Sequence, residues 1–305
     1  MGTPDFAAGV LQALVDAKHD VVLVVSQPDR AVGRKRVITT TPVKNVAQTH
    51  DIPVFQPERI KEDHAPILEA HADIIITAAY GQIVPKIILD APKLGCINVH
   101  ASLLPKYRGG APIHQAIIDG EPETGVTIMY MEESMDTGDI IAKKVIPILE
   151  ADDVGTMFEK LSTLGAELLV ETLPRIANGT SDRMAQDEAD VSYAWNIKRG
   201  QEQIEWRKTW REVYNQIRGL HPWPVAFSVV TDVNFKVFRA KPTDIKSSAG
   251  AGTIHNISAD GIDVVCGDGG VLRLTDIQMA GKKRILMKDL LNGSHPFEVG
   301  KQLGN

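Results

Sequence analysis

Short apolar, β-branched runs alternate with amphipathic helical patterns through the first 180 residues. The runs have the length of β-strands and lie at residues 20–26, 52–55, 73–78, 96–100, 126–131 and 140–146. Strands that alternate with helices are typical of a parallel sheet covered by helices on both faces. The pattern therefore predicts an α/β domain with a doubly wound parallel sheet.

The intervening helices are predicted at residues 6–17, 42–49, 64–71, 112–119 and 156–176. The start of the second is well marked, because Thr41 can cap the helix and Pro42 is tolerated at its first position. The last and longest helix places its leucines on one face and stops at Asn178-Gly179. It is expected to close the first domain.

The remainder of the chain has a different pattern. Polar residues dominate from Thr180 to about Gly200 and the periodicity is lost, which indicates a linker. After Trp206 one helical pattern ends at Gly219, and short strands separated by turn signals follow. This spacing predicts a small β-barrel. We therefore expect a first domain at residues 1–180, a linker at 181–200 and a barrel domain at 201–305.

The start of the sequence is unusual for this architecture. Residues 2–5, Gly-Thr-Pro-Asp, predict a turn into a helix, and in a doubly wound sheet such a turn follows the first, central strand. That strand is missing ahead of the turn. We therefore expect the natural protein to begin several residues upstream, with a short apolar strand leading into Met1.

Composition and charge narrow the class of protein. With 43% hydrophobic and 24% charged residues, the 305-residue chain is typical of a soluble globular protein. No apolar run approaches the roughly 20 residues of a membrane span, and the first residues lack the pattern of a signal peptide, so a cytoplasmic protein is expected. Cys96 and Cys266 form no CxxC pair, so neither a disulfide framework nor a zinc site is predicted.

The net charge of -6 conceals an uneven distribution. Residues 201–305 carry 14 basic and 11 acidic side chains, whereas the preceding residues carry 19 and 28. Basic charge is thus concentrated where a polyanion could dock.

The richest candidate for chemistry is the segment from Asn98 to Pro105. Alternation along a strand places Asn98 and His100 on one face, at the carboxyl end where open α/β sheets bind ligands. Asp136 lies in a turn between two predicted strands and could orient a nearby histidine and favour its charged form. The alternative is structural: Asn98 and His100 would only hold the loop, and Asp136 would be a solvated or capping carboxylate.

Two basic segments carry a similar ambiguity. Residues 29–36 hold four cations in an expected loop, and residues 281–284 hold three in the second domain. Such clusters bind phosphates, but each could equally be a solvated surface. Two of them in an acidic protein favour a polyanionic partner.

Common nucleotide and hydrolase motifs are not found. The sequence contains no P-loop, and no G-x-G-x-x-G follows a strand, which disfavours ATP or NAD as the principal ligand. Neither G-x-S-x-G nor H-E-x-x-H occurs. The four tryptophans are expected to be core or interdomain packing residues: Trp195, Trp206, Trp210 and Trp223.

From end to end, the chain resembles the methionyl-tRNA formyltransferase family. The matching segments are residues 2–6, 27–30, 41–44, 98–109, 135–139, 216–220, 222–224 and 280–284. The Asn-x-His-x-Ser-Leu-Leu-Pro segment with the later aspartate is shared by folate-dependent formyltransferases, including those for glycinamide ribonucleotide or an aminosugar nucleotide. The basic segment and the second domain point to the tRNA branch.

The resemblance implies a Rossmann-like formyltransferase domain followed by an OB-like β-barrel that supports tRNA. It implies 10-formyltetrahydrofolate as formyl donor and initiator methionyl-tRNA as acceptor. A metal is not expected, because the formyl group is already activated on N10 of the folate, and the protein is expected to be a monomer. The site residues that follow are Asn98, His100 and Asp136 for catalysis, Ser102, Leu103, Leu104 and Pro105 for folate, and Arg34, Lys35, Arg36, Lys282, Lys283 and Arg284 for tRNA.

The chemistry expected of the trio is stabilisation of a tetrahedral oxyanion. The Asn98 amide and a protonated His100 would donate hydrogen bonds to the oxygen, and Asp136 or a water it positions would take the amine proton. Three alternatives stay open at this stage: a 10-formyltetrahydrofolate hydrolase, a formyltransferase for another amine, and a non-catalytic RNA-binding protein.

Overall fold

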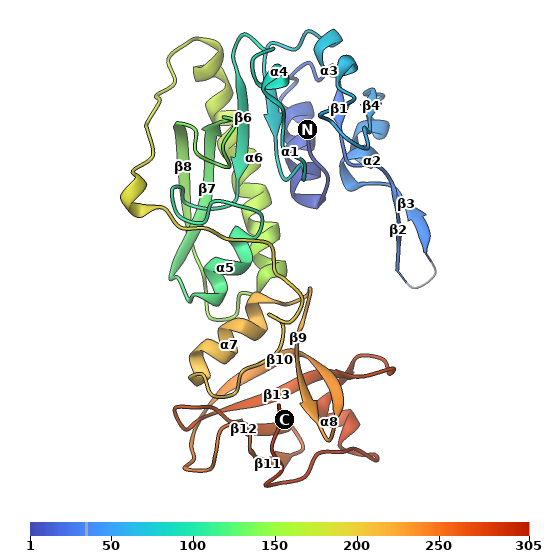
Figure 1. Ribbon diagram of the computed structural model, residues 1–305, viewed down its shortest axis with the longest axis vertical. Helices are drawn as coiled ribbons and strands as arrows, with labels where there is room; N and C mark the ends of the chain where they lie inside the picture. Colours follow the sequence, from blue (N-terminus) through green and yellow to red (C-terminus); the bar gives the residue numbers. More distant parts are fainter. Residues whose placement is uncertain (34–35, 305) are drawn as a thin grey trace. The chain divides into compact units, whose positions relative to one another are not determined.

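The computed structural model describes residues 1–33 and 36–304, and the chain forms two compact units (Figure 1). The first unit comprises Met1–Pro112, Glu123–Pro147 and Phe158–Trp195. The second comprises Ile113–Pro122, Ile148–Met157 and Asn196–Asn305.

The sheet of the first unit confirms the predicted α/β class. Strand β1 (Val24–Val25) pairs in parallel with β4 (Val54–Phe55), and β5 (Ile75–Thr77) pairs in parallel with β6 (Cys96–His100). The purely parallel arrangement was wrong at one strand. In the order β5-β6-β7-β8, β7 (Glu123–Tyr130) runs antiparallel to both β6 and β8 (Ile140–Pro147). The connection from β7 to β8, residues 131–139, is too short for the crossover that parallel neighbours need.

Helices lie where the periodicity predicts them, within a few residues at each end. They are α1 (Asp5–Asp16), α2 (Pro42–Thr49), α3 (Ala65–Glu69), α5 (Pro112–Ile118) and α6 (Val154–Ala177). Thr41 caps α2 as expected, because its hydroxyl accepts a hydrogen bond from the amide of Lys44. Helix α4 (Lys86–Leu89) was not predicted, because four residues are too few to show a helical period.

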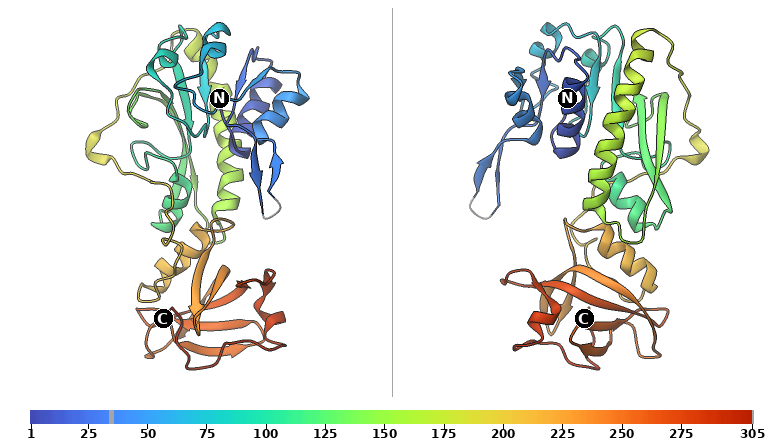
Figure 2. Two further views of the ribbon diagram at one scale, coloured as in Figure 1. Left: turned by 45° about the vertical axis from the view of Figure 1, so that its right-hand side comes forward. Right: turned by 180° about the vertical axis from the view of Figure 1, so that it is seen from behind.

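Helix α6 lies along one side of the strands of the first unit (Figure 2) and packs against the Val99 side of β6. A Cβ on Gly165 of this helix would lie 2.9 Å from Val99 Cγ1, so the glycine permits close contact with the strand. Since successive side chains of a strand point to opposite faces, Asn98 and His100 point away from α6.

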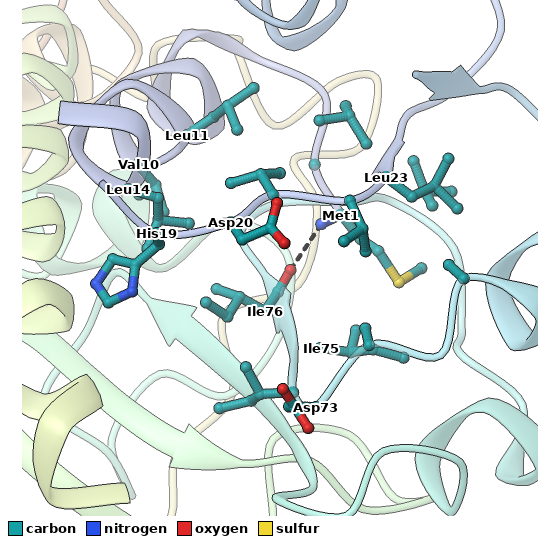
Figure 3. A pocket seen from close by; sticks show the side chains of 18 of the residues that line it. Met1, Val10, Leu11, Leu14, His19, Asp20, Leu23, Asp73, Ile75 and Ile76 are labelled. Atoms are coloured by element: carbon teal, nitrogen blue, oxygen red, sulfur yellow. Dashed lines mark hydrogen bonds between the residues drawn. The ribbon is translucent and has the colours of Figure 1, made fainter. Parts of the chain in front are cut away.

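Met1 and Gly2 lie between β1 and β5. The Gly2 amide donates to the carbonyl of Val25, and the Met1 amine donates to the carbonyl of Ile76 at 2.6 Å (Figure 3). These two residues thus occupy the end of the position that a central strand takes in a doubly wound sheet. Beside them is a cavity of about 510 Å³, whose apolar lining includes Leu11, Leu14, Leu23, Ile74 and Ile76 (Figure 3).

The second unit is mostly strands. Helix α7 (Trp210–Gly219) begins with a capping box between Thr209 and Glu212. The sheet that follows has the order β11-β12-β13-β10-β9, with β14 paired to β13 and every pairing antiparallel. Its members are β9 (Ala226–Val230), β10 (Val233–Lys246), β11 (Ile254–Ser258), β12 (Gly261–Val265), β13 (Gly270–Met279) and β14 (Ile285–Leu286), followed by α8 (Met287–Leu290). The turn spacing predicts a small β-barrel, and the structure shows a small domain made mostly of short antiparallel strands.

Candidate active site

Asn98 lies near the carboxyl end of β6, next to Thr77 of β5. The Thr77 side chain is buried, and its hydroxyl donates to Asn98 Oδ1 at 2.8 Å. Because an acceptor oxygen of the amide is engaged in this way, Nδ2 is the atom left to donate to a ligand. Thr77 was not among the predicted site residues, since nothing in the sequence of a buried strand marks one threonine as the partner of a residue on the next strand.

His100 ends the same strand and is buried, at 6% exposure. Its Nε2 donates to the carbonyl oxygen of Tyr107 at 3.0 Å. This contact defines the tautomer: the neutral ring carries its proton on Nε2, and Nδ1 gains one only in the imidazolium form. The backbone loop after β6 therefore orients the ring.

Asp136 lies opposite Nδ1 of His100. Its Oδ2 is 3.8 Å from Nδ1, which is too long for a hydrogen bond but close enough to stabilise a charged ring. The same oxygen accepts a hydrogen bond of 2.8 Å from the Gly109 amide. Asp136 itself has a φ of 53°, in the left-handed region that aspartate tolerates better than most residues. The structure thus places Asp136 beside His100 at the end of β6, and Asn98 lies two residues earlier on the same strand, as the alternation predicts.

The four predicted folate residues form a loop directly after β6, and the carbonyl and amide groups of that loop are anchored by Thr127. The Thr127 hydroxyl donates to the Ser102 carbonyl at 2.7 Å and accepts from the Leu104 amide at 3.1 Å. Ser102 and Leu104 are fully buried, whereas Leu103 and Pro105 are partly exposed. Within this loop, Leu103 and Pro105 are accordingly the two more exposed side chains.

A buried arginine supports the loop that contains Asp136, through the side chain of Gln186. Arg108 is 1% exposed and donates through Nε and Nη2 to Gln186 Oε1, at 3.0 and 2.9 Å. Gln186 in turn donates to the carbonyl oxygens of Asp136 and Gly138, both at 2.8 Å. Gln186 was missed, because it lies in the segment expected to be a linker; that segment instead contributes residues up to Trp195 to the first unit.

Part of the predicted basic loop at residues 29–36 is a strand. Strand β2 (Arg30–Val32) pairs antiparallel with β3 (Val37–Thr39), so the description of residues 30–32 as a loop was wrong, and we call this pair of strands the basic hairpin. Two paired strands satisfy each other's backbone groups, whatever the charge of their side chains. Arg34 and Lys35 lie outside the described residues, and Arg36 is exposed with a φ of 48°.

The base of this hairpin is held by a charged contact. The Lys44 ammonium and Asp29 form an ion pair, and Gln56 Nε2 donates to the other carboxylate oxygen of Asp29 at 2.8 Å. Hydrogen bonds from Gln56 and Lys44 hold the pKa of Asp29 below its ordinary value. The hairpin is therefore fixed to the domain at its base.

The second basic cluster lies in the second unit, between β13 and β14. Lys282 and Lys283 are exposed. Arg284 is paired with Asp276 at 3.0 Å, and its guanidinium lies 4.2 Å from the centre of the Phe238 ring. Arg284 is thus already engaged within the protein, and the two lysines are the more accessible cations of this cluster.

The described part of the chain has no helix that is both long and apolar enough to cross a membrane. It also contains no group of three or more His, Cys, Asp or Glu side chains arranged to hold a metal ion.

Comparison with known proteins gives matches along the chain. Residues 1–173 match the family described as formyl transferase, and residues 196–295 match the formyl transferase C-terminal domain. A methionyl-tRNA formyltransferase of Staphylococcus aureus (strain bovine RF122 / ET3-1) is 52% identical across 99% of this chain and 98% of its own length. The enzyme of strain JH1 of the same species matches with the same identity and coverage.

Solved structures share the fold at lower identity. The N-formyltransferase of Helicobacter canadensis, in complex with folinic acid and dTDP-3-aminofucose, has a TM-score of 0.69 and 21% identity, over 91% of this chain and 97% of that one. A 4-N formyltransferase of Francisella tularensis has a TM-score of 0.57 and 19% identity, over 74% of this chain and 89% of that one. At these identities the likeness concerns the fold alone.

Proposed function

The chain belongs to the methionyl-tRNA formyltransferase family, and from that premise we propose that it transfers a formyl group from 10-formyltetrahydrofolate to the α-amine of initiator methionyl-tRNA. The product is N-formylmethionyl-tRNA. The reaction joins the amine nitrogen to the formyl carbon and breaks the bond from that carbon to N10 of the folate. One proton leaves the attacking amine, and one is delivered to N10.

Asn98 supplies the first stabilising contact in this proposal. Attack on the formyl carbon converts its carbonyl oxygen into an oxyanion, and Asn98 Nδ2 donates a hydrogen bond to it. The Thr77 hydroxyl fixes the amide before substrate arrives, so no reorganisation accompanies the reaction. A preorganised donor of this kind contributes about 3 to 4 kcal/mol to the stability of the transition state.

His100 acts with Asp136 in the second stabilising contact. The imidazolium form carries its second proton on Nδ1, the nitrogen that faces Asp136. The oxyanion can accept a hydrogen bond from this Nδ1 proton. The Asp136 carboxylate compensates the positive charge of the ring. Asp136, or a water bound to it, then accepts the proton of the attacking amine.

The substrates are held by neighbouring segments. The folate lies against the loop of Ser102, Leu103, Leu104 and Pro105, where the partly exposed Leu103 and Pro105 provide apolar contact. The phosphates of the tRNA bind the basic hairpin at Arg34, Lys35 and Arg36, and the second unit at Lys282 and Lys283. Arg284 contributes less, because Asp276 already neutralises it.

One observation carries the proposal: three polar side chains meet at the end of β6, and each is fixed by its own protein partner. Thr77 fixes Asn98, the Tyr107 carbonyl fixes His100, and the Gly109 amide fixes the Asp136 carboxylate. Catalysis requires the reacting groups to be held in fixed positions at the ligand-binding end of the sheet, and these contacts support that role.

The test is to replace each member of the trio by alanine. Asn98→Ala, His100→Ala and Asp136→Ala should each lower kcat by about 100-fold or more, while tRNA binding in a filter assay is retained, because the groups act on the transition state. His19→Ala serves as the control, since this histidine is exposed beyond the end of α1. Unchanged turnover in the Asp136 variant would remove that carboxylate from the mechanism.

A further inference from the structure

Two large aromatic side chains lie exposed on the segment that follows the 3-10 helix Glu188–Asp190. Tyr193 is 48% exposed and Trp195 is 58% exposed. Their rings are stacked, with centroids 5.2 Å apart and planes 6° from parallel. The expectation that Trp195 is a packing residue was therefore wrong, although Trp206 is buried as predicted.

The backbone holds this pair in place. Arg108 and Tyr193 form an isolated parallel bridge: the Arg108 amide donates to the Ser192 carbonyl at 2.9 Å, and the Ala194 amide donates to the Arg108 carbonyl at 2.7 Å. Ala194 is fully buried, whereas the side chains on either side of it, Tyr193 and Trp195, are exposed. The rings are therefore presented on a fixed backbone.

The same segment contacts the loop that holds Asp136. Gly109 donates its amide hydrogen to Asp136, and a Cβ at Gly109 would lie 2.7 Å from the Ala194 carbonyl oxygen. Ala194, which lies between the two aromatic residues in the sequence, thus packs directly against the residue that fixes the Asp136 carboxylate.

We propose that Tyr193 and Trp195 form a stacking platform for an unpaired base at the 3′ end of the methionyl-tRNA. This inference rests on the proposed function. The amino acid is esterified to the last nucleotide of a single-stranded end, so the adjoining bases must lie beside the site when the amine reaches the formyl carbon. Unpaired bases stack on exposed aromatic side chains in many RNA-binding proteins.

The type of contact follows from the chemistry of the two rings. An aromatic ring offers its face to a base and no charge to a phosphate. The acidic residues before the platform add no phosphate site: Asp187 and Asp190 are exposed, and Glu188 is paired with Arg108 at 2.9 Å. The contribution of the platform to affinity is accordingly independent of salt, unlike that of the basic hairpin.

The test measures steady-state kinetics and fluorescence on the full chain. Tyr193→Ala and Trp195→Ala should each raise the KM for methionyl-tRNA about tenfold, equally at low and high salt, with kcat and the KM for 10-formyltetrahydrofolate nearly unchanged. Trp195→Phe should restore most of the affinity, because it keeps a stacking ring. Met184→Ala is the matched control: it lies on the same segment and is 54% exposed, but it is not aromatic.

Binding of methionyl-tRNA without folate should quench tryptophan fluorescence in the wild type, and less so in Trp195→Phe. A rise in the KM for folate in place of tRNA, an equal effect of Met184→Ala, or quenching that does not depend on Trp195 would overturn the platform. Formylation of methionyl-tRNA by the wild type tests the proposed function separately, and the quenching experiment remains valid without turnover.

Discussion

Replacing Thr77 by valine should slow formyl transfer without unfolding the protein. The side chain is 2% exposed, and valine has nearly the same shape and suits a β-strand. The change removes the hydroxyl that donates to Asn98 Oδ1 at 2.8 Å. A hydrogen bond of this type has a net value of about 0.5 to 1.5 kcal/mol, so kcat should fall about two- to twelvefold if the bond serves only to orient the Asn98 amide.

The assay is steady-state turnover with both substrates saturating, beside urea unfolding of the same preparation. The free energy of unfolding should fall by about 1 kcal/mol. Because Thr77 acts through Asn98, the double variant Thr77→Val/Asn98→Ala should be no slower than Asn98→Ala alone. A further loss in the double variant, or an unchanged kcat in Thr77→Val, would refute this reasoning.

Neutralising Arg34, Lys35 and Arg36 together should weaken the use of tRNA as substrate and leave folate binding unchanged. The logarithmic slope of tRNA affinity against salt should fall by about 0.7 to 0.9 for each lost phosphate contact. An unaltered slope would show that the hairpin is only a solvated surface. Gly109→Ala should lower both the melting temperature and kcat, because φ is 117° there and the new Cβ would meet the Ala194 carbonyl. Gly200→Ala, with a φ of 101° and open space around the new Cβ, should lower stability alone. Equal losses of kcat in the two variants would contradict this. Fusing about five β-branched residues ahead of Met1 should raise the melting temperature, because they can pair with β1 and β5 and fill the cavity beside these strands. An equal rise in melting temperature with a Gly-Ser extension of the same length would argue against this explanation.

Local patterns predicted the elements of the first domain well. The helix α2 begins at Pro42 with Thr41 as its cap, as the dipeptide indicates, and the alternation along β6 places Asn98 and His100 on one face. These features depend on neighbours within a few residues of each other. Short stretches of sequence are therefore enough to predict them.

Contacts between distant segments could not be predicted in the same way. The bond from Thr77 to Asn98 joins two strands, and the support of the Asp136 loop by Gln186 comes from residues about 50 positions away. Polar composition made the segment of Gln186 resemble a linker, although its side chain carries four hydrogen bonds. The direction of β7 likewise depends on its pairing with β6 and β8. Side chains alternate in the same way along a strand of either direction, so the alternation does not predict it.

The catalytic roles of Asn98, His100 and Asp136 remain predictions, as do the contacts with folate and tRNA. Geometry supports them to different degrees. The trio meets in one place, whereas among the proposed tRNA residues Arg284 is already paired with Asp276.

The most direct measurement is the transfer of labelled formyl from 10-formyltetrahydrofolate to methionyl-tRNA, with initiator and elongator tRNAs compared in the same assay. The account predicts rapid labelling of the charged initiator tRNA, little labelling of the elongator, and no consumption of the formyl donor when methionyl-tRNA is omitted. Consumption of the donor at the same rate without tRNA would identify a hydrolase, and binding of tRNA with no transfer of label would contradict the proposed enzyme.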